Sequence, residues 1–302
     1  MKYLNHVIAA AKTSTKPLIY APLGDRTPLP QEFVDLAREH RIMLSRSADR
    51  SMRAMAQATF YARSVERAKE QVRHPPLAGL PKLGSGTQPE WLGKQVLAAA
   101  GIRMPQGALA KTLDEALTVA KHLKFPVVLK AQAGALAHKT EAGGVLLNIK
   151  DEEGLRAAWT TLHANIEKHQ PGLQLDGVLV EKMAAKGLEL VIGAKRDPLW
   201  GPVLMVGLGG IWVEALGDVR LMPPDLSEAA IIEELFKLRT AKLLKGFRGA
   251  PAVDVEAVAK TVALVGRLMT HAPDIVEIDI NPVFAHGVGE GVTAVDALIV
   301  TR

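Results

Sequence analysis

Three groups of polar residues in this chain have types and spacings that suit the binding of a phosphorylated ligand and a metal ion. The first lies in the segment VVLKAQAGALAHKTEAGGVLL, residues Val127–Leu147. Here Lys130 closes a predicted buried strand, and the pair Gly143 and Gly144 opens the next one. An ammonium group at a strand end can bind phosphate oxygens, and glycines let backbone N–H groups approach them closely. Alone the pattern is weak, because a lysine at a strand end more often simply reaches solvent.

The second group lies in VLVEKMAAKGLELVIG, residues Val178–Gly193. Glu181 ends a predicted strand, Glu189 lies on the next strand, and the residues between them could form a hinge. A hinge can offer backbone N–H and C=O groups to an adenine base, and a carboxylate can hold a ribose diol. The alternative is a hairpin that carries two exposed glutamates.

The third group lies in IVEIDINPVF, residues Ile275–Phe284. Strand alternation places Glu277, Asp279 and Asn281 on one face, and Asp296 follows in an adjacent predicted strand. Proteins commonly bind Mg²⁺ through one or two carboxylates together with substrate phosphates and water. Asp279, Asn281 and Asp296 are therefore candidate metal ligands.

The elements that must position these groups alternate between helix and strand. Hydrophobic periodicity predicts helices at 91–100, 113–123, 152–168, 227–237 and 255–271, and strands at 107–110, 126–131, 144–149, 177–183, 275–280 and 292–299, with several strands between 188 and 221. Thr87 with Glu90, and Thr112 with Glu115, have the spacing of a capping box that begins a helix.

The first part of the chain has a different organisation. Residues 16–23 and 42–45 predict short strands, and residues 30–40 and 48–72 predict helices, which gives two units of a doubly wound sheet. Such a domain usually needs more strands, so residues 1–72 look like the end of a longer domain. Residues 73–88 are rich in proline and glycine and predict a linker.

Composition excludes several classes of protein. The 302 residues contain no cysteine, which rules out disulfides and thiolate metal sites and suits the cytoplasm. No apolar run suggests a membrane helix, and the N-terminus makes a poor signal peptide. The net charge is +5, and residues 1–75 hold 13 Lys or Arg against 7 Asp or Glu. No RNA- or DNA-binding motif accompanies these charges, so we predict a solvated helix face and not a nucleic-acid site.

Residues 88–302 resemble the ATP-grasp domain of the NDP-forming acyl-CoA synthetases, which are relatives of the succinyl-CoA synthetase β subunit. The most specific motifs are HKTEAGGV (138–145), GPVLMVGLGGIWVE (201–214), LLKGFRG (243–249) and EIDINP (277–282). Residues 1–72 resemble, less specifically, the C-terminal part of the flavodoxin-like ligase-CoA domain. The resemblance implies two α+β lobes that clasp ATP in residues 89–302.

The resemblance also assigns residue roles. It implies that Lys130 contacts the ATP phosphates, that Gly143 and Gly144 belong to a loop covering them, that Glu181 and Met183 form the adenine hinge, and that Glu189 holds the ribose. It implies Asn281 and Asp296 as Mg²⁺ ligands, with Asp279 as a weaker third. His138 matches a histidine proposed to accept the phosphoryl group; the alternative role is phosphate binding or ordering of the loop.

The activity implied is the reversible reaction of a carboxylate, CoA and ATP to acyl-CoA, ADP and phosphate. The family also needs a CoA-binding domain and a second histidine in a flavodoxin-like domain, and neither fits in residues 1–72. We therefore expect a CoA-binding partner subunit, or further domains of the same enzyme, to carry the carboxylate and CoA. The alternative is a catalytically idle ATP-binding module that scaffolds or regulates a partner.

Overall fold

The computed structural model describes residues 2–22, 28–69, 77–134, 136, 139–210 and 217–302. They belong to two units, residues 1–71 and residues 72–302, and each is described by itself. Within these ranges no helix combines the length and the apolar character needed to cross a membrane.

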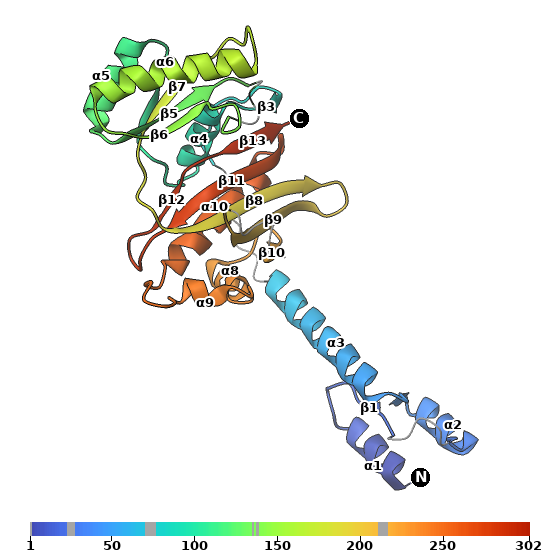
Figure 1. The fold of residues 1–302 in the computed structure, drawn as a ribbon. Helices are drawn as coiled ribbons and strands as arrows, with labels where there is room; N and C mark the ends of the chain where they lie inside the picture. The colour runs from blue at the N-terminus through green and yellow to red at the C-terminus, as the bar shows by residue number, and fades with distance from the viewer. Residues whose placement is uncertain (1, 23–27, 70–76, 135, 137–138, 211–216) are drawn as a thin grey trace. The chain divides into compact units, whose positions relative to one another are not determined.

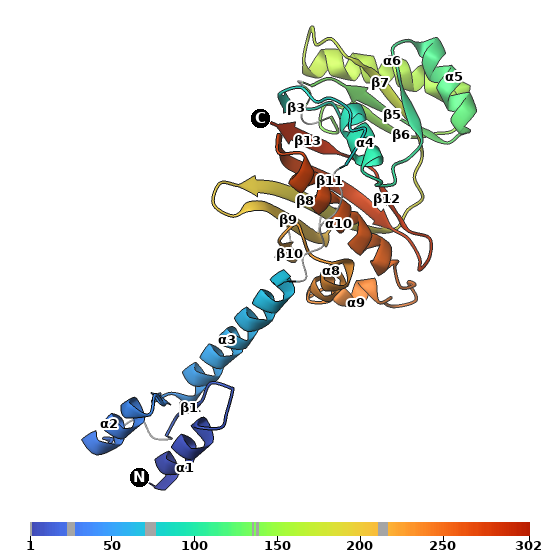
Figure 2. The same ribbon diagram turned by 180° about the vertical axis from the view of Figure 1, so that it is seen from behind.

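The first unit has the predicted alternation of helix and strand, preceded by one further helix (Figures 1 and 2). Its elements are α1 (Lys2–Ala11), β1 (Ile19–Tyr20), α2 (Gln31–Glu39), β2 (Met43–Leu44) and α3 (Ala48–Lys69). The two strands pair in parallel, and a small core joins Leu4 and Ile8 of α1 to Phe33 of α2. A two-stranded sheet buries little apolar surface, and the core among the described residues of this unit is correspondingly small.

In the second unit, four of the described strands form an antiparallel sheet in the order β4, β7, β5, β6. Their bounds are β4 (Gly107–Ala110), β5 (Val127–Gln132), β6 (Val145–Ile149) and β7 (Gly177–Lys182). Helices α5 (Leu113–Leu123) and α6 (Glu152–His169) cover one face, as Figure 1 shows. Leu129 on β5 and Leu162 on α6 are fully buried in the core between these layers.

Another seven described strands of the second unit form a larger sheet in the order β10, β9, β8, β11, β13, β3, with β12 paired to β11. The strands are β3 (Gly86–Thr87), β8 (Leu188–Asp197), β9 (Gly201–Leu208), β10 (Val219–Met222), β11 (Ile275–Ala285), β12 (Val292–Ala294) and β13 (Leu298–Thr301). The helices are α4 (Glu90–Ala99), α8 (Glu228–Leu235), α9 (Ala241–Leu244) and α10 (Val255–His271). Helix α10 packs on β8, β9 and β11 and buries Val262 and Leu268.

The hairpin between β8 and β9 presents two large apolar side chains to solvent. Leu199 is 90% exposed and Trp200 is 82% exposed. The carboxylate of Asp197 accepts backbone N–H bonds from both residues, at 2.8 and 2.9 Å. The bond from Trp200, followed by the bond from Leu199, lowers the pKa of Asp197. The turn is therefore held in one shape although its tip is exposed.

Two local expectations differ from the structure in ways that affect the site. The capping box at Glu90 is wrong: Pro89 is the N-cap of α4, without a side-chain bond, and the Glu90 carboxylate contacts lysines instead. The box at Thr112 is confirmed in its N-cap half, since its hydroxyl accepts the Glu115 N–H at 3.2 Å. The strand expected at 292–299 is interrupted at 295–297, which places Asp296 between β12 and β13.

Candidate functional site

Two lysines and two glutamates form a buried ion cluster between α4 and the four-stranded sheet. Glu90 and Lys94 lie one turn apart on α4, Lys130 lies on β5, and Glu181 lies on β7. Lys94 Nζ is 2.8 Å from Glu90 Oε1 and 2.5 Å from Glu181 Oε1. Lys130 Nζ is 2.7 Å from Glu90 Oε1 and 3.1 Å from Glu181 Oε2. None of the four side chains is more than 7% exposed.

The cluster favours the charged forms of Glu90 and Lys130, whereas burial, and then the nearby Lys130, lower the pKa of Lys94. Burial opposes the ionisation of Glu90, but three nearby ammonium groups, Lys130 first, hold the pKa of Glu90 well below its usual range. Burial also opposes the protonation of Lys130, and the surrounding carboxylates, with Glu90 first, raise the pKa of Lys130. Lys130 Nζ further donates a hydrogen bond of 2.8 Å to the backbone oxygen of Val295. Lys130 is therefore a charged group that is fixed in position.

The candidate metal ligands line one cavity of about 280 Å³. Asp279 and Asn281 come from β11, and Asp296 comes from the segment between β12 and β13. Glu90, Gln132, Gly134, Leu136 and Lys139 are among the other residues of its walls. The third member of the predicted strand face, Glu277, does not line the cavity and lies 3.7 Å from Lys195.

The charge of this cavity suits a cation. Burial, and then the carboxylates of Asp296 and Glu277, raise the pKa of Asp279. A bound cation would relieve this repulsion. No group of three or more His, Cys, Asp or Glu side chains suited to a metal occurs in the described residues. Mg²⁺ would therefore depend on Asn281 and on oxygen atoms of a bound ligand in addition to Asp279 and Asp296.

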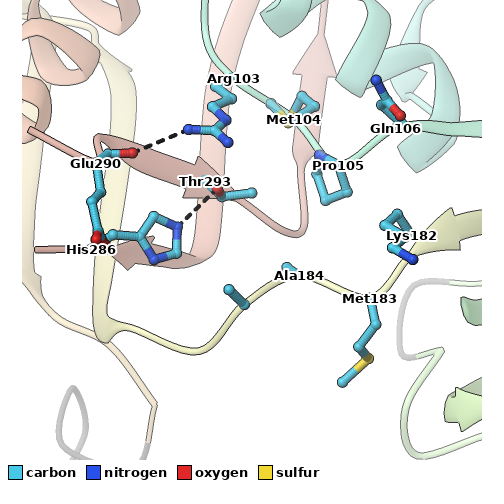
Figure 3. A pocket seen from close by; sticks show the side chains of 11 residues that line it. Arg103, Met104, Pro105, Gln106, Lys182, Met183, Ala184, His286, Glu290 and Thr293 are labelled. Carbon is cyan, nitrogen blue, oxygen red and sulfur yellow. Dashed lines mark hydrogen bonds between the residues drawn. The ribbon is translucent and has the colours of Figure 1, made fainter. Parts of the chain in front are cut away.

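A second cavity, of about 570 Å³, lies beside the stretch that follows β7 (Figure 3). Its walls are Arg103, Met104, Pro105, Gln106, Lys182, Met183, Ala184, Ala185, His286, Glu290 and Thr293. Arg103 donates a 3.1 Å hydrogen bond to the Glu290 backbone oxygen, and His286 Nε2 lies 3.0 Å from Thr293 Oγ1. This cavity, whose walls include Met183 and its neighbours in residues 182–185, is large enough for a base.

The residues predicted for the hinge and the ribose separate in the structure. Met183 lines the larger cavity, whereas the carboxylate of Glu181 lies in the ion cluster. Glu189 is exposed on β8 opposite Phe284, and no described cavity includes it. A Cβ atom on Gly210 would lie 2.5 Å from Glu189 Oε2, so glycine at 210 leaves room for this carboxylate.

The predicted glycine pair lies directly before β6. Gly143 has a φ of +64°, and a Cβ there would lie 2.6 Å from Asn165 Nδ2. Asn165 in turn donates a 3.0 Å hydrogen bond to the Gly143 oxygen. Gly144 N–H donates to the Lys139 oxygen at 2.8 Å, which closes the loop. The backbone conformation thus requires glycine at 143.

His138 lies outside the described residues. Sequence reasoning missed Glu90, Lys94 and Lys139 as members of the site. The pair Glu90 and Lys94 has the i, i+4 spacing of an ion pair on a helix, which was an available signal. Lys139 follows His138 directly but has no spacing that reveals its partners.

Comparisons with known proteins identify the family of this chain. A family model described as an ATP-grasp domain matches residues 82–301. The chain is 38% identical over 214 residues to the beta subunit of ADP-forming acetate–CoA ligase II of Pyrococcus furiosus, covering 70% of this chain and 91% of that subunit. It is 40% identical over 292 residues to a trans-feruloyl-CoA synthase from an unknown prokaryotic organism, covering 96% of this chain but only 41% of the synthase.

A solved structure also matches. It is the dinucleotide-forming acetyl-coenzyme A synthetase 1 of Ca. Korarchaeum cryptofilum, in complex with coenzyme A and Mg-AMPPCP. Its phosphohistidine segment is described as pointing towards the nucleotide binding site. The TM-score is 0.63 at 35% identity, over 72% of this chain and 93% of that chain. The chain therefore belongs to the family of ATP-grasp subunits and domains of the ADP-forming acyl-CoA synthetases.

Proposed function

We propose that this chain is the nucleotide-binding and phosphoryl-transfer component of an ADP-forming acyl-CoA synthetase of the cytoplasm. The complete reaction would convert a carboxylate, CoA and ATP to acyl-CoA, ADP and phosphate. The main support is that Asp279, Asn281 and Asp296 line one cavity together with Glu90, which contacts Lys130. A carboxylate–amide set beside a charged lysine suits a nucleotide with its metal.

In this proposal the larger cavity, with Met183 and the backbone of residues 182–185, takes the adenine. Glu181 would contribute to the adenine hinge through its place near the end of β7, and it belongs to the ion cluster that holds Lys130. Glu189 would hold the ribose. Lys130, whose Nζ atom lies in the ion cluster and lines neither cavity, would bind phosphate oxygens by virtue of its positive charge, with Gly143 and Gly144 in the loop that covers them.

The proposed metal ligands are Asn281, Asp296 and Asp279. Bound Mg²⁺ would neutralise phosphate charge during the transfer. The role of this chain would be to hold the phosphates in line with the acceptor. Such positioning supplies much of the rate in phosphoryl transfer.

We assign the acceptor role to His138, whose imidazole would take the γ-phosphoryl group while ADP leaves. The description of a phosphohistidine segment in the Korarchaeum synthetase supports phosphoryl transfer through a histidine in that enzyme, and we place the histidine at His138 by the resemblance of its motif. The chain spans only 41% of the feruloyl-CoA synthase that it resembles, so a CoA-binding partner subunit or domain would complete the reaction.

Phosphorylation by γ-labelled ATP with Mg²⁺, in the presence of the CoA-binding partner, tests the proposal. The parent chain should acquire an acid-labile, base-stable label, and His138→Ala should abolish the label while ATP affinity stays within a few fold. The exposed His122→Ala variant on α5 is the matched control and should be labelled normally. ATP binding without a label on this chain, while the partner's own histidine is labelled, would leave His138 only a binding role; no label on either would favour an idle module.

A further inference from the structure

The ammonium group of Lys139 lies between a buried glutamate and a proposed metal ligand. Its Nζ atom is 2.5 Å from Glu90 Oε2 and 3.5 Å from Asp296 Oδ1. The Lys139 side chain is 15% exposed and lines the cavity that contains Asp279 and Asn281. Lys139 therefore supplies positive charge inside the same cavity that the metal would enter.

Lys139 and a metal ion would compete for the same oxygen atoms. The carboxylate of Asp296 faces Lys139 while its Oδ1 also accepts the Ala297 N–H at 2.8 Å. A divalent cation at Asp296 would repel the neighbouring ammonium group, because like charges this close interact strongly inside a protein. Entry of the metal must therefore weaken or break the contact between Lys139 and Asp296.

Glu90 gives Lys139 a second carboxylate partner in the same cavity. Glu90 is held at the first turn of α4 by Lys94 and Lys130, and its Oε2 atom contacts Lys139. Lys139 follows the glycine-containing stretch 133–138 and precedes Gly143, so its backbone belongs to a loop and not to β5 or β6. The lysine can thus turn away from Asp296 while it stays next to Glu90.

We propose that Lys139 is a second phosphate-binding residue, which neutralises Asp296 when no metal is bound and moves to the nucleotide phosphates when Mg²⁺ takes that carboxylate. The inference rests on the proposed function, since it places a nucleotide and its metal in this cavity. It differs from a purely structural role, in which Lys139 would only tie the loop to α4.

The test is the affinity for ADP, measured by calorimetry in EDTA and in Mg²⁺, for the parent, Lys139→Gln and Lys139→Arg. Removal of the ammonium group should weaken ADP binding in EDTA roughly tenfold, because phosphates then face Asp296 without compensation. In Mg²⁺ the variant loses the phosphate contact of Lys139, but the metal no longer competes with an ammonium group at Asp296, so the net loss should be smaller than in EDTA. The dissociation constant for ADP in EDTA, divided by that in Mg²⁺, should therefore rise by roughly threefold or more in Lys139→Gln. Lys139→Arg should restore the affinity in EDTA.

Lys121→Gln is the matched control, because Lys121 pairs with Glu152 on the surface at 3.1 Å. Lys139→Gln should fold, since Glu90 keeps two ammonium partners, and its unfolding midpoint checks this. If Lys139→Gln weakens ADP binding equally in both buffers, the ratio is unchanged and Lys139 has a structural role. This result would overturn the inference but not the proposed function. Failure of the parent to bind ADP in either buffer would overturn the proposed function and the inference with it.

Discussion

Lys94 on α4 and Glu181 on β7 join this helix to the four-stranded sheet, with 2.5 Å between Nζ and Oε1. Both side chains are almost completely buried, and Glu181 also contacts Lys130. The position of Lys130 therefore depends on an ion pair that does not itself face either cavity where the nucleotide would bind.

Removal of one partner should be costly for folding. We expect Lys94→Met to lower the free energy of unfolding by about 3–5 kcal/mol, because Glu90 and Glu181 lose a buried counter-ion. Denaturant unfolding measures the change. The exposed pair Lys121 and Glu152 gives the comparison, and Lys121→Met should change stability by less than about 1 kcal/mol. Equal effects of the two substitutions would show that the buried cluster contributes no more than a surface pair.

The stability of the second unit should depend on the ionisation of Asp218. Burial opposes ionisation, but the Thr240 hydroxyl and the backbone N–H groups of Arg239 and Thr240 outweigh it and lower the pKa of Asp218. A pKa that is lower in the folded state gives stability that is present above the ordinary aspartate pKa, about 4, and is lost as the pH falls through the folded value.

We therefore expect Asp218→Asn to reduce the loss of stability on acidification below about pH 4. Thermal unfolding between neutral and acidic pH measures this. Asp274, which is exposed and lies 3.5 Å from Arg302, is the control, and Asp274→Asn should leave the pH dependence unchanged. A parallel pH profile for Asp218→Asn and the parent would contradict the assignment.

The proposed metal ligands predict a metal-specific loss of affinity. Asn281→Ala and Asp296→Ala should each weaken ADP binding in Mg²⁺ by roughly tenfold, about 1.4 kcal/mol, and change binding in EDTA less. The reason is that these oxygen atoms should face the metal and not the base or ribose. Calorimetry in both buffers separates the two contributions. If both variants bind ADP with Mg²⁺ like the parent, while Asp279→Ala does not, the ligand set is wrong.

The glycine at 143 predicts a backbone effect that is local to the loop. Gly143→Ala should destabilise the folded chain by about 1–3 kcal/mol, because the φ of +64° is unfavourable for alanine and Cβ meets the Asn165 side chain. The double variant with Asn165→Ala should recover the part that is due to the clash, while the backbone strain remains. Denaturant unfolding of the three variants measures both parts, and full recovery would show that φ has no cost.

Periodicity predicted most of the second unit because its strands and helices bury regular faces. The helices at 113–123 and 255–271 are confirmed at both ends. Alternation along β11 also brought Asp279 and Asn281 to one cavity. The break at Asp296 could not be predicted, because the bond from Lys130 to the Val295 oxygen joins positions 165 residues apart.

Glu90 shows most clearly why local spacing fails at the site. Its distance in sequence from Thr87 predicted a capping box, which would contribute only about 1 kcal/mol. The structure instead offers it ammonium groups from α4, from β5 and from the loop at Lys139. Contacts to charged partners inside the protein outweigh a cap, and these partners are not visible in the sequence around Glu90. The direction of the Glu181 side chain was unpredictable for the same reason.

Trp200, at the exposed tip of the β8–β9 hairpin, is a fluorophore that can report binding at this turn. Of the four tryptophans, Trp200 has its indole almost entirely in water, whereas Trp159 lies 4.9 Å, between ring centroids, from the imidazole of His163. Asp197 holds the turn through two backbone hydrogen bonds, so a molecule that covers the turn changes the surroundings of this fluorophore directly. Any molecule that settles on the β8–β9 turn must shift the emission of Trp200 to shorter wavelength and protect it from dissolved quenchers, without any label being attached.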